Sequence, residues 1–266
     1  MHAIVCIKQV PDTTDVKVNP ETGTLIREGV PSIVNPFDTY AIEEALRLKE
    51  KHGGKVTVVC MGPPQAKEAL KEAVAMGADE AVLLCDRTFA GSDTWATAYT
   101  LSQAIRQMSN YDVIFCGKQA IDGDTGQVGP GIAVQLGIQQ LTYVFKIQEI
   151  DFDKRTLTVE RLLEEGREVV RTVLPAVITV VKDINQPRYP TFMGIRRATK
   201  MEIPVWTAET LLGSNRSYFG LDGSPTRVVK VFNPPPRGGQ VVLAEGDTPQ
   251  EQAASLAETL LSEKII

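Results

Sequence analysis

The chain has 266 residues, 43% of them hydrophobic, and a formal net charge of −5 at pH 7. This length suits one large α/β domain with an appendage, or two modest domains. Basic residues are interspersed with acidic ones, which argues against a nucleic-acid-binding protein. No apolar run approaches the roughly 20 residues that cross a bilayer, and the start lacks a signal-peptide pattern, so we expect a soluble, cytoplasmic protein without membrane insertion.

The chain offers few residues for metal or triad chemistry. Its four cysteines each lie in or at the end of an apolar, strand-like run, and none is spaced as CxxC, which favours free thiols over disulfides or a metal site. The chain has only two histidines, His2 and His52, so it offers few of the residues that a zinc site or a histidine-based triad requires. We therefore assign no catalytic residue and expect the chemistry to belong to a bound cofactor.

The first half of the chain alternates short β-branched runs with helical patterns. This βαβ alternation favours a mostly parallel, doubly wound sheet with helices on both faces. A long first connection has turn residues between two short alternating runs, which predicts a β-hairpin insertion near 16–27. Strands are predicted at 3–8, 55–60, 80–85 and 112–116, and helices near 38–52, 64–76 and 93–109.

The second half has a different pattern. From residue 141, successive strand-like runs separated by short turns predict an antiparallel extension of the sheet. Beyond it the periodicity weakens until a strand near 226–232, a proline-rich stretch and a helix near 248–263. We expect a nucleotide-binding α/β domain at 1–200 and a C-terminal arm at 201–266 that wraps another subunit, with a small autonomous lobe as the alternative.

A glycine-rich stretch, GKQAIDGDTGQVGPG at 117–131, follows the strand-like run VIFC. Its glycines allow close backbone approach to a ligand, and a helix expected near 127–136 would aim its N-terminal amides at a phosphate beyond the strand. The stretch is neither a P-loop nor a dinucleotide fingerprint. Thr125 is a suitable phosphate donor, whereas Asp122 and Asp124 would repel a diphosphate unless they point elsewhere. A glycine-rich turn capped by Asp124 is the structural alternative.

Longer segments resemble a known family. VERLLEEGREVVRTVLPAVITV at 159–180 and NQPRYPTFMGI at 185–195 resemble the signature of the small, or beta, subunit of electron-transfer flavoproteins. SIVNPFDTYAIEEALRLKE, AMGADEAVLL and GKQAID are also similar to that family, so the resemblance spans essentially the whole chain. It implies a sheet of the adenine-nucleotide-binding type, which electron-transfer flavoproteins share with universal-stress-like proteins. It also implies an obligate heterodimer with a large, or alpha, subunit that carries one FAD.

The resemblance also implies an adenine-nucleotide site in this chain. Carried over position by position, its lining follows the first strand, includes the start of the first helix and ends in the glycine-rich loop. The cofactor-binding residues are then Cys6, Asn35, Pro36, Phe37, Asp38, Met61, Val113, Gly117, Lys118, Gln119, Ala120, Ile121, Asp122, Gly123, Asp124, Thr125, Gly126, Gln127 and Val128.

The identity of the ligand divides the family. Conventional members hold AMP there as a structural ligand, whereas electron-bifurcating members hold a second FAD that accepts hydride from NADH. The loop DGDTGQVGPG and Pro190 after the tyrosine resemble the bifurcating group. This implies that electrons pass along two branches. One branch leads to the FAD of the partner subunit and an acyl-CoA dehydrogenase-type or other flavin dehydrogenase. The other leads to a low-potential acceptor such as ferredoxin or flavodoxin. A conventional AMP-binding carrier subunit without its own redox chemistry and a stand-alone nucleotide-binding regulatory module are the alternatives.

A partner-recognition loop is expected at 185–197, because the family docks onto dehydrogenases with a loop at this place, anchored by an apolar side chain. Phe192 stands at the anchor position, and its alternative role is a core contact for the following helix. The partner-binding set is Tyr189, Pro190, Thr191, Phe192 and Met193.

Overall fold

A computed structural model describes residues 1–12, 31–229, 241 and 243–265. The chain divides into two compact units, Met1–Lys230 and Val231–Ile266. The hairpin predicted near 16–27 lies outside the described residues.

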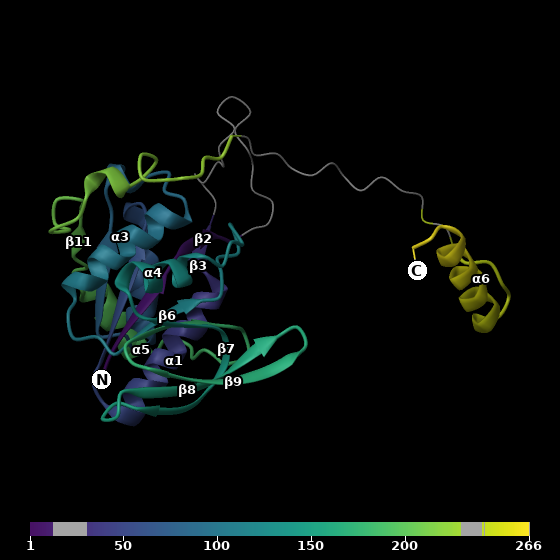
Figure 1. Cartoon of the computed structure of the whole chain (residues 1–266), viewed down its shortest axis with the longest axis horizontal. Helices are drawn as coiled ribbons and strands as arrows, with labels where there is room; N and C mark the ends of the chain where they lie inside the picture. The colour runs from purple at the N-terminus through teal and green to yellow at the C-terminus, as the bar shows by residue number, and fades with distance from the viewer. Residues whose placement is uncertain (13–30, 230–240, 242, 266) are drawn as a thin grey trace. The chain divides into compact units, whose positions relative to one another are not determined.

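A mixed sheet forms the centre of the first unit (Figure 1). Among the described residues it has nine strands in the order β11-β5-β4-β1-β6-β10-β7-β8-β9. The strands from β11 to β7 pair in parallel, and β8 and β9 extend the sheet antiparallel. The predicted mostly parallel sheet with an antiparallel extension is confirmed. Its strands are β1 (His2–Ile7), β4 (Lys55–Met61), β5 (Glu80–Leu84), β6 (Val113–Gly117), β7 (Gln139–Asp151), β8 (Thr156–Leu163), β9 (Gly166–Val173), β10 (Ala176–Val180) and β11 (Val205–Trp206).

Helices cover both faces of this sheet because the central strands are apolar on both sides. In β1, Ala3 and Val5 join one core cluster while Ile4 joins the other, as the two-residue period of a strand requires. One cluster contains residues of α1 (Pro36–His52), α2 (Lys67–Met76) and α5 (Phe192–Lys200). The other contains residues of α3 (Thr94–Gln107) and α4 (Val128–Leu136).

Short elements accompany the sheet among the described residues of the first unit. Strands β2 (Gln9–Pro11) and β3 (Ser32–Val34) form a separate antiparallel pair. The 3-10 turns are η1 (Pro64–Ala66), η2 (Arg87–Phe89) and η3 (Arg216–Tyr218). In the part of the chain that the structure describes, no helix combines the length and the apolar character needed to cross a membrane.

The compact unit runs past residue 200, the expected domain boundary, to Lys230. Ala208, Leu211 and Phe219 are buried in the core cluster beside α3, and the Phe219 ring packs edge-on against Phe89 at 5.0 Å between centroids. Apolar burial therefore ties this weakly periodic segment to the sheet domain. The strand predicted near 226–232 is wrong over its described residues, 226–229, which pair with no strand of the described chain.

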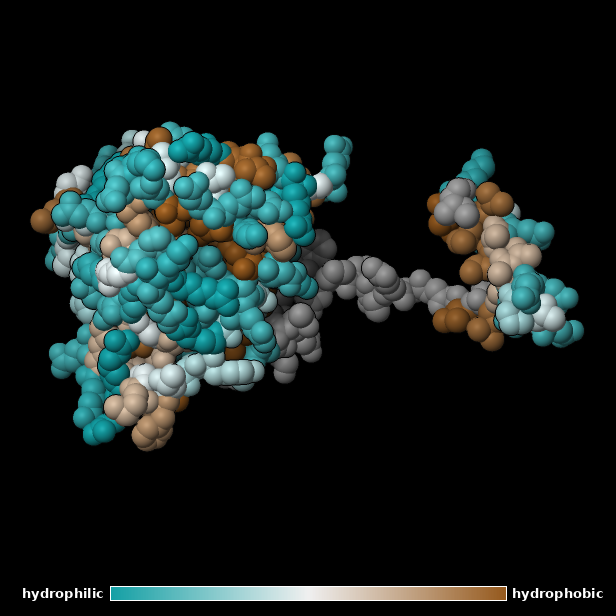
Figure 2. Space-filling view, turned by 90° about the horizontal axis from the view of Figure 1, so that it is seen from below, coloured by the Kyte–Doolittle hydropathy of each residue, from teal (hydrophilic) through white to brown (hydrophobic). Residues whose placement is uncertain are grey.

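The second unit contains α6 (Pro249–Ser262), and the helix predicted near 248–263 is confirmed. Thr248 and Glu251 form a capping box that fixes its start. Ala253, Leu256, Ala257 and Leu260 recur at the spacing of one helix face, yet no residue of α6 is buried. Figure 2 shows the surface of this helix divided between hydrophobic and hydrophilic groups.

We predict that Phe219→Ala lowers the free energy of unfolding by about 3–5 kcal/mol, because it leaves a cavity in the core. Leu212→Ala in the same segment is the control, since Leu212 is 77% exposed, and it should cost less than about 0.5 kcal/mol. Urea denaturation measures both values. Equal, small effects would show that this segment does not contribute to the core.

Candidate functional site

The candidate site lies where the strand order reverses. From β1 the chain continues through α1 to β4, which pairs with one edge of β1. The other edge of β1 pairs with β6, and the sheet continues on that side with β10 and β7. Cys6 near the end of β1 stands opposite Cys116 near the end of β6. Open α/β sheets bind ligands beyond the carboxyl ends of their strands at such a reversal.

Asp38, in the first turn of α1, joins the ends of these two strands. Its carboxylate accepts hydrogen bonds from the backbone amides of Lys8 at 2.7 Å and Gly117 at 3.1 Å. A Cβ atom at residue 117 would lie 2.4 Å from Asp38 Oδ1, so this approach requires glycine. Burial raises the pKa of Asp38 to about 7, against the lowering effect of these hydrogen bonds.

Asn35, the residue before α1, fixes the following loop. Its side-chain amide donates to the carbonyl oxygen of Gln119 at 2.9 Å, and its side-chain oxygen accepts from the amide of Ile121 at 3.1 Å. Asn35 is 1% exposed. A buried side chain that satisfies both a donor and an acceptor of the loop backbone holds that backbone in one conformation.

The two loop aspartates bond to neighbouring side chains. Asp122 pairs with Lys8 Nζ at 2.6 and 2.8 Å, and Asp124 accepts a hydrogen bond from the Gln119 side chain. Neither side chain caps α4, so the capped-turn alternative is not formed. The lysine also compensates the charge of one carboxylate, which reduces the repulsion expected towards a phosphate.

The start of α4 has no side-chain cap, unlike the starts of α3 and α5. Its Ncap residue, Gln127, instead accepts a hydrogen bond through Oε1 from the Thr94 hydroxyl at 2.8 Å. Gly126 has a φ of +63°, and a Cβ at the exposed Gly123 would meet nothing within 4 Å. The helix N-terminus thus offers amides and open space to an anion.

The structure brings most of the predicted lining together at this edge of the sheet. Cys6 and the start of α1 adjoin the loop 117–128, and Met61 ends the neighbouring strand β4. Val113 is an exception: it begins β6, four residues before Gly117, which is about 13 Å away at the usual rise of a strand. Val113 is fully buried in the core.

Three cysteines near this edge of the sheet have free, buried thiols: Cys6, Cys60 and Cys116. Burial raises the pKa of Cys60 to about 12, and a hydrogen bond with Cys6, together with burial, raises that of Cys116. Such thiols stay protonated at neutral pH and are poor nucleophiles.

Sequence reasoning missed three residues that shape the loop. Lys8 pairs with Asp122, Thr94 bonds to Gln127, and the ring of Tyr143 lies 5.1 Å from Lys118 Nζ. A lysine directly after a buried strand was a signal for the first. For Thr94 and Tyr143 the sequence contains no such signal, because only tertiary packing brings them to the loop.

The predicted recognition segment 185–197 presents an apolar tip. Tyr189 is 92% exposed, Phe192 80% and Met193 66%, so Phe192 is not part of the core that the described residues form. Pro190 lies between them, half-buried. Thr191 caps α5 by accepting a hydrogen bond from the amide of Gly194 at 3.0 Å, which assigns it a structural role.

Charged contacts hold the base of this segment on α1. Arg188 hydrogen-bonds to Glu43 through Nε at 2.8 Å and also pairs with Glu50. Although burial acts to raise the pKa of Glu43, hydrogen bonds from Arg188 and Arg47 outweigh it, so the pKa is lowered. The base of the exposed tip is therefore fixed to α1, the helix that follows Asn35.

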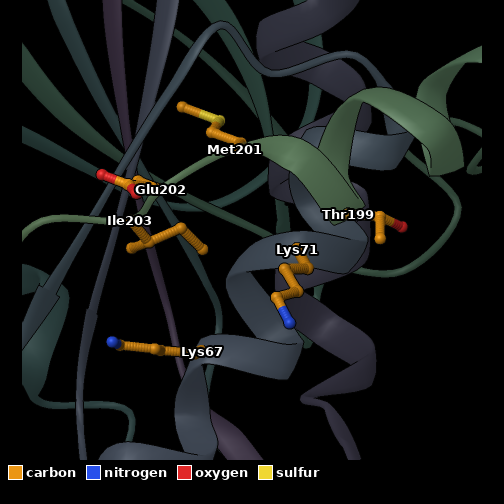
Figure 3. A pocket seen from close by; sticks show the side chains of 6 residues that line it. All are labelled: Lys67, Lys71, Thr199, Met201, Glu202 and Ile203. Atoms are coloured by element: carbon orange, nitrogen blue, oxygen red, sulfur yellow. The ribbon is translucent and has the colours of Figure 1, made fainter.

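Helix α5 packs closely on α2. A Cβ at Gly194 would lie 2.1 Å from the carbonyl oxygen of Ala75. A pocket of about 420 Å³ lies at the interface of these two helices. Figure 3 shows the side chains around it, which come from α2, α5 and residues 201–203. None of its lining residues belongs to the loop 117–128; they are Lys67, Lys71, Thr199, Met201, Glu202 and Ile203.

Comparison with known proteins identifies the family. Residues 22–211 match the family model described as electron transfer flavoprotein domain. The chain belongs to the electron transfer flavoprotein family. It is 53% identical to the electron transfer flavoprotein subunit beta of Thermoanaerobacterium thermosaccharolyticum, over 100% of both chains.

Two further relatives extend this comparison. Protein FixA of Azotobacter vinelandii is 48% identical over 98% of this chain and 94% of its own. The caffeyl-CoA reductase-Etf complex subunit CarD of Acetobacterium woodii is 47% identical over 100% of both. The chain is thus a beta subunit of the electron transfer flavoprotein family, whose members pair with an alpha subunit and bind flavin or AMP.

We predict that Asp38 makes the stability of this electron transfer flavoprotein subunit depend on pH. Between its ordinary pKa of 3.8 and its raised pKa of about 7, the folded state retains a proton that the unfolded state has released. The free energy of unfolding should therefore fall as pH rises through this range. Denaturation of the wild type and of Asp38→Asn at several pH values measures this, because the variant lacks the titrating group. If the difference between the two proteins does not change with pH, Asp38 has no raised pKa.

Proposed function

We propose that this chain is the small subunit of an electron-bifurcating electron transfer flavoprotein and that the loop 117–128 holds its own FAD. The supporting observation is the uncapped start of α4 at the strand reversal, where the loop aspartates are bonded to Lys8 and Gln119. The loop sequence, which resembles the bifurcating group, favours FAD over AMP.

The residues present fit a flavin nucleotide. The first-turn amides of α4 and the hydroxyl of Thr125 would hold phosphate oxygens, and the positive φ of Gly126 gives the loop its turn. When bound, FAD supplies hydride acceptance from NADH and single-electron transfer. Within this chain, Asn35 and Asp38 keep the loop fixed, and Lys8 compensates the charge of Asp122.

The proposed dehydrogenase partner follows from one exposed surface. The exposed tip at Tyr189 and Phe192 would dock on a flavin dehydrogenase of the acyl-CoA dehydrogenase type. The name of the CarD relative, which places it in a caffeyl-CoA reductase complex, supports a partner that acts on a CoA ester. Ferredoxin or flavodoxin would accept the low-potential electron.

The C-terminal arm is proposed to hold the alpha subunit. Its helix α6 has an apolar stripe but buries no residue within its own unit. The arm predicted at 201–266 is, in this proposal, the part from Val231 onward, because residues before it belong to the sheet domain. Burial of the α6 stripe would then occur on the partner.

The alternative is a conventional carrier subunit with AMP in the same site. The experiment that decides is to co-express the chain with its alpha subunit, purify the heterodimer without added nucleotide, and quantify the released FAD and AMP by chromatography. We predict two FAD per heterodimer. One FAD with one AMP would establish the conventional carrier, and no nucleotide beyond the alpha subunit's FAD would refute the site.

Gly126→Val tests the loop within the same experiment. Gly126 and Gly137 both have positive φ, +63° and +67°, and lie at opposite ends of α4. Valine at either position strains the backbone by about 1–2 kcal/mol, but Gly126→Val alone should remove the second nucleotide. Gly137→Val is therefore the matched control, and equal nucleotide contents would contradict our assignment of the loop.

For docking, we predict that Phe192→Ala slows electron delivery to the dehydrogenase about tenfold or more, as expected for a central aromatic anchor. The heterodimer and its nucleotide content should remain intact, because Phe192 is 80% exposed. Stopped-flow reduction of the dehydrogenase measures the rate, with the exposed Leu212→Ala as control. An unchanged rate would remove Phe192 from the interface.

A further inference from the structure

Two adjacent residues at the start of α3 contact two different parts of the protein. Thr94 donates a hydrogen bond to Gln127 of the loop at 2.8 Å. Asp93 accepts hydrogen bonds through Oδ2 from the amide and the hydroxyl of Thr226, at 2.9 and 2.8 Å. Thr226 lies five residues before Val231, where the second unit begins.

Asp93 also caps α3. Its Oδ1 accepts from the amide of Ala96 at 3.0 Å, while its own amide donates to Ser224 Oγ at 2.8 Å. Burial acts to raise the pKa of Asp93, but hydrogen bonds from Ala96 and Thr226 outweigh it and lower the pKa. The carboxylate is therefore charged at neutral pH, and both of its oxygens are used.

The segment before Thr226 lies tightly against the segment before Asp93. A Cβ at Gly91 would lie 2.7 Å from the Leu221 side chain, and one at Gly220 would lie 2.2 Å from the carbonyl oxygen of Thr88. Both glycines also have positive φ, so a side chain at either position is disfavoured by the backbone conformation as well as by the close approach. Close packing of this kind transmits a shift instead of absorbing it.

The two helices at the site are also in close contact. A Cβ at Gly131 of α4 would lie 2.7 Å from the Cβ of Ala98 in α3. A ligand that orders the start of α4 therefore acts on a helix that packs against α3. The start of α4 includes its Ncap residue Gln127, which accepts a hydrogen bond from Thr94. The path from the loop to Thr226 consists of two hydrogen-bonded contacts and one peptide bond.

We propose that Asp93 is a positioning residue that ties the root of the C-terminal arm to the nucleotide site, so that a bound nucleotide stabilises the root, residues 224–226. The inference rests on the proposed function, because it requires a nucleotide at the loop 117–128. By linkage, fixing the root would in turn strengthen nucleotide binding by the same factor.

The test is hydrogen exchange on the heterodimer freed of nucleotide, with FAD or AMP added as the probe. In the wild type, we expect the nucleotide to slow exchange in the loop 117–128 and, by about tenfold, at the backbone amides of Ser224 and Thr226, the two that residues 224–226 possess. Asp93→Asn should keep the loop protection and lose the effect at 224–226. Asparagine caps a helix as well as aspartate does, but its amide nitrogen cannot accept the second set of hydrogen bonds.

Asp86→Asn is the matched control. Asp86 caps η2 and accepts a hydrogen bond from the amide of Ala208 at 3.0 Å, so it also ties a turn to the C-terminal segment. Its carboxylate accepts from Thr88 and Ala208, and neither residue belongs to the loop. This variant should keep the nucleotide effect at 224–226. Thr226→Val, which removes one donor from a surface residue, should weaken the effect and provides a second test if Asp93→Asn does not fold.

Each result has a defined meaning. Loop protection without a change at 224–226 in the wild type would overturn this inference and leave the proposed site intact. The same holds if the nucleotide still slows exchange at 224–226 in Asp93→Asn. No protection of the loop by FAD or AMP would refute the proposed site and the inference together.

Discussion

A buried carboxylate is the constraint on which this site depends. Asp38 accepts hydrogen bonds from the backbone amides of Lys8, just after β1, and Gly117, at the end of β6, and it therefore sets the spacing of the two strand ends at the reversal. Its burial disfavours the charged form, which is reflected in the raised pKa. Gly117 must lack a side chain for this contact, so the sheet edge and the loop that leaves it are determined together.

The loop shows how a sequence with two aspartates remains compatible with an anionic ligand. Each carboxylate has a partner within the chain, and the helix that follows keeps its first amides free of a side-chain cap. Charge compensation by Lys8 comes from the end of β1, 114 residues away in the sequence. The electrostatics of the site are therefore a property of the sheet order and not of the loop alone.

Helix α1 connects two functional surfaces of the subunit. Its start positions the loop through Asn35 and Asp38, and its later turns hold Arg188 at the base of the exposed tip through Glu43 and Glu50. One rigid element thus sets the positions of the candidate nucleotide site and the candidate docking surface. A partly buried ion pair such as Arg188–Glu43 contributes more to the geometry of this arrangement than to its stability.

The sequence by itself determined the parallel sheet, its antiparallel extension and α6, because hydrophobic periodicity and capping residues act over short stretches of chain. Motif resemblance assigned the family and most of the residues that meet at the strand reversal. Only the tertiary structure placed Val113 at the far end of β6, brought Lys8 and Thr94 to the loop, and packed Phe219 into the core. These contacts join residues far apart in the chain, and their energies depend on burial and distance, which no local pattern encodes.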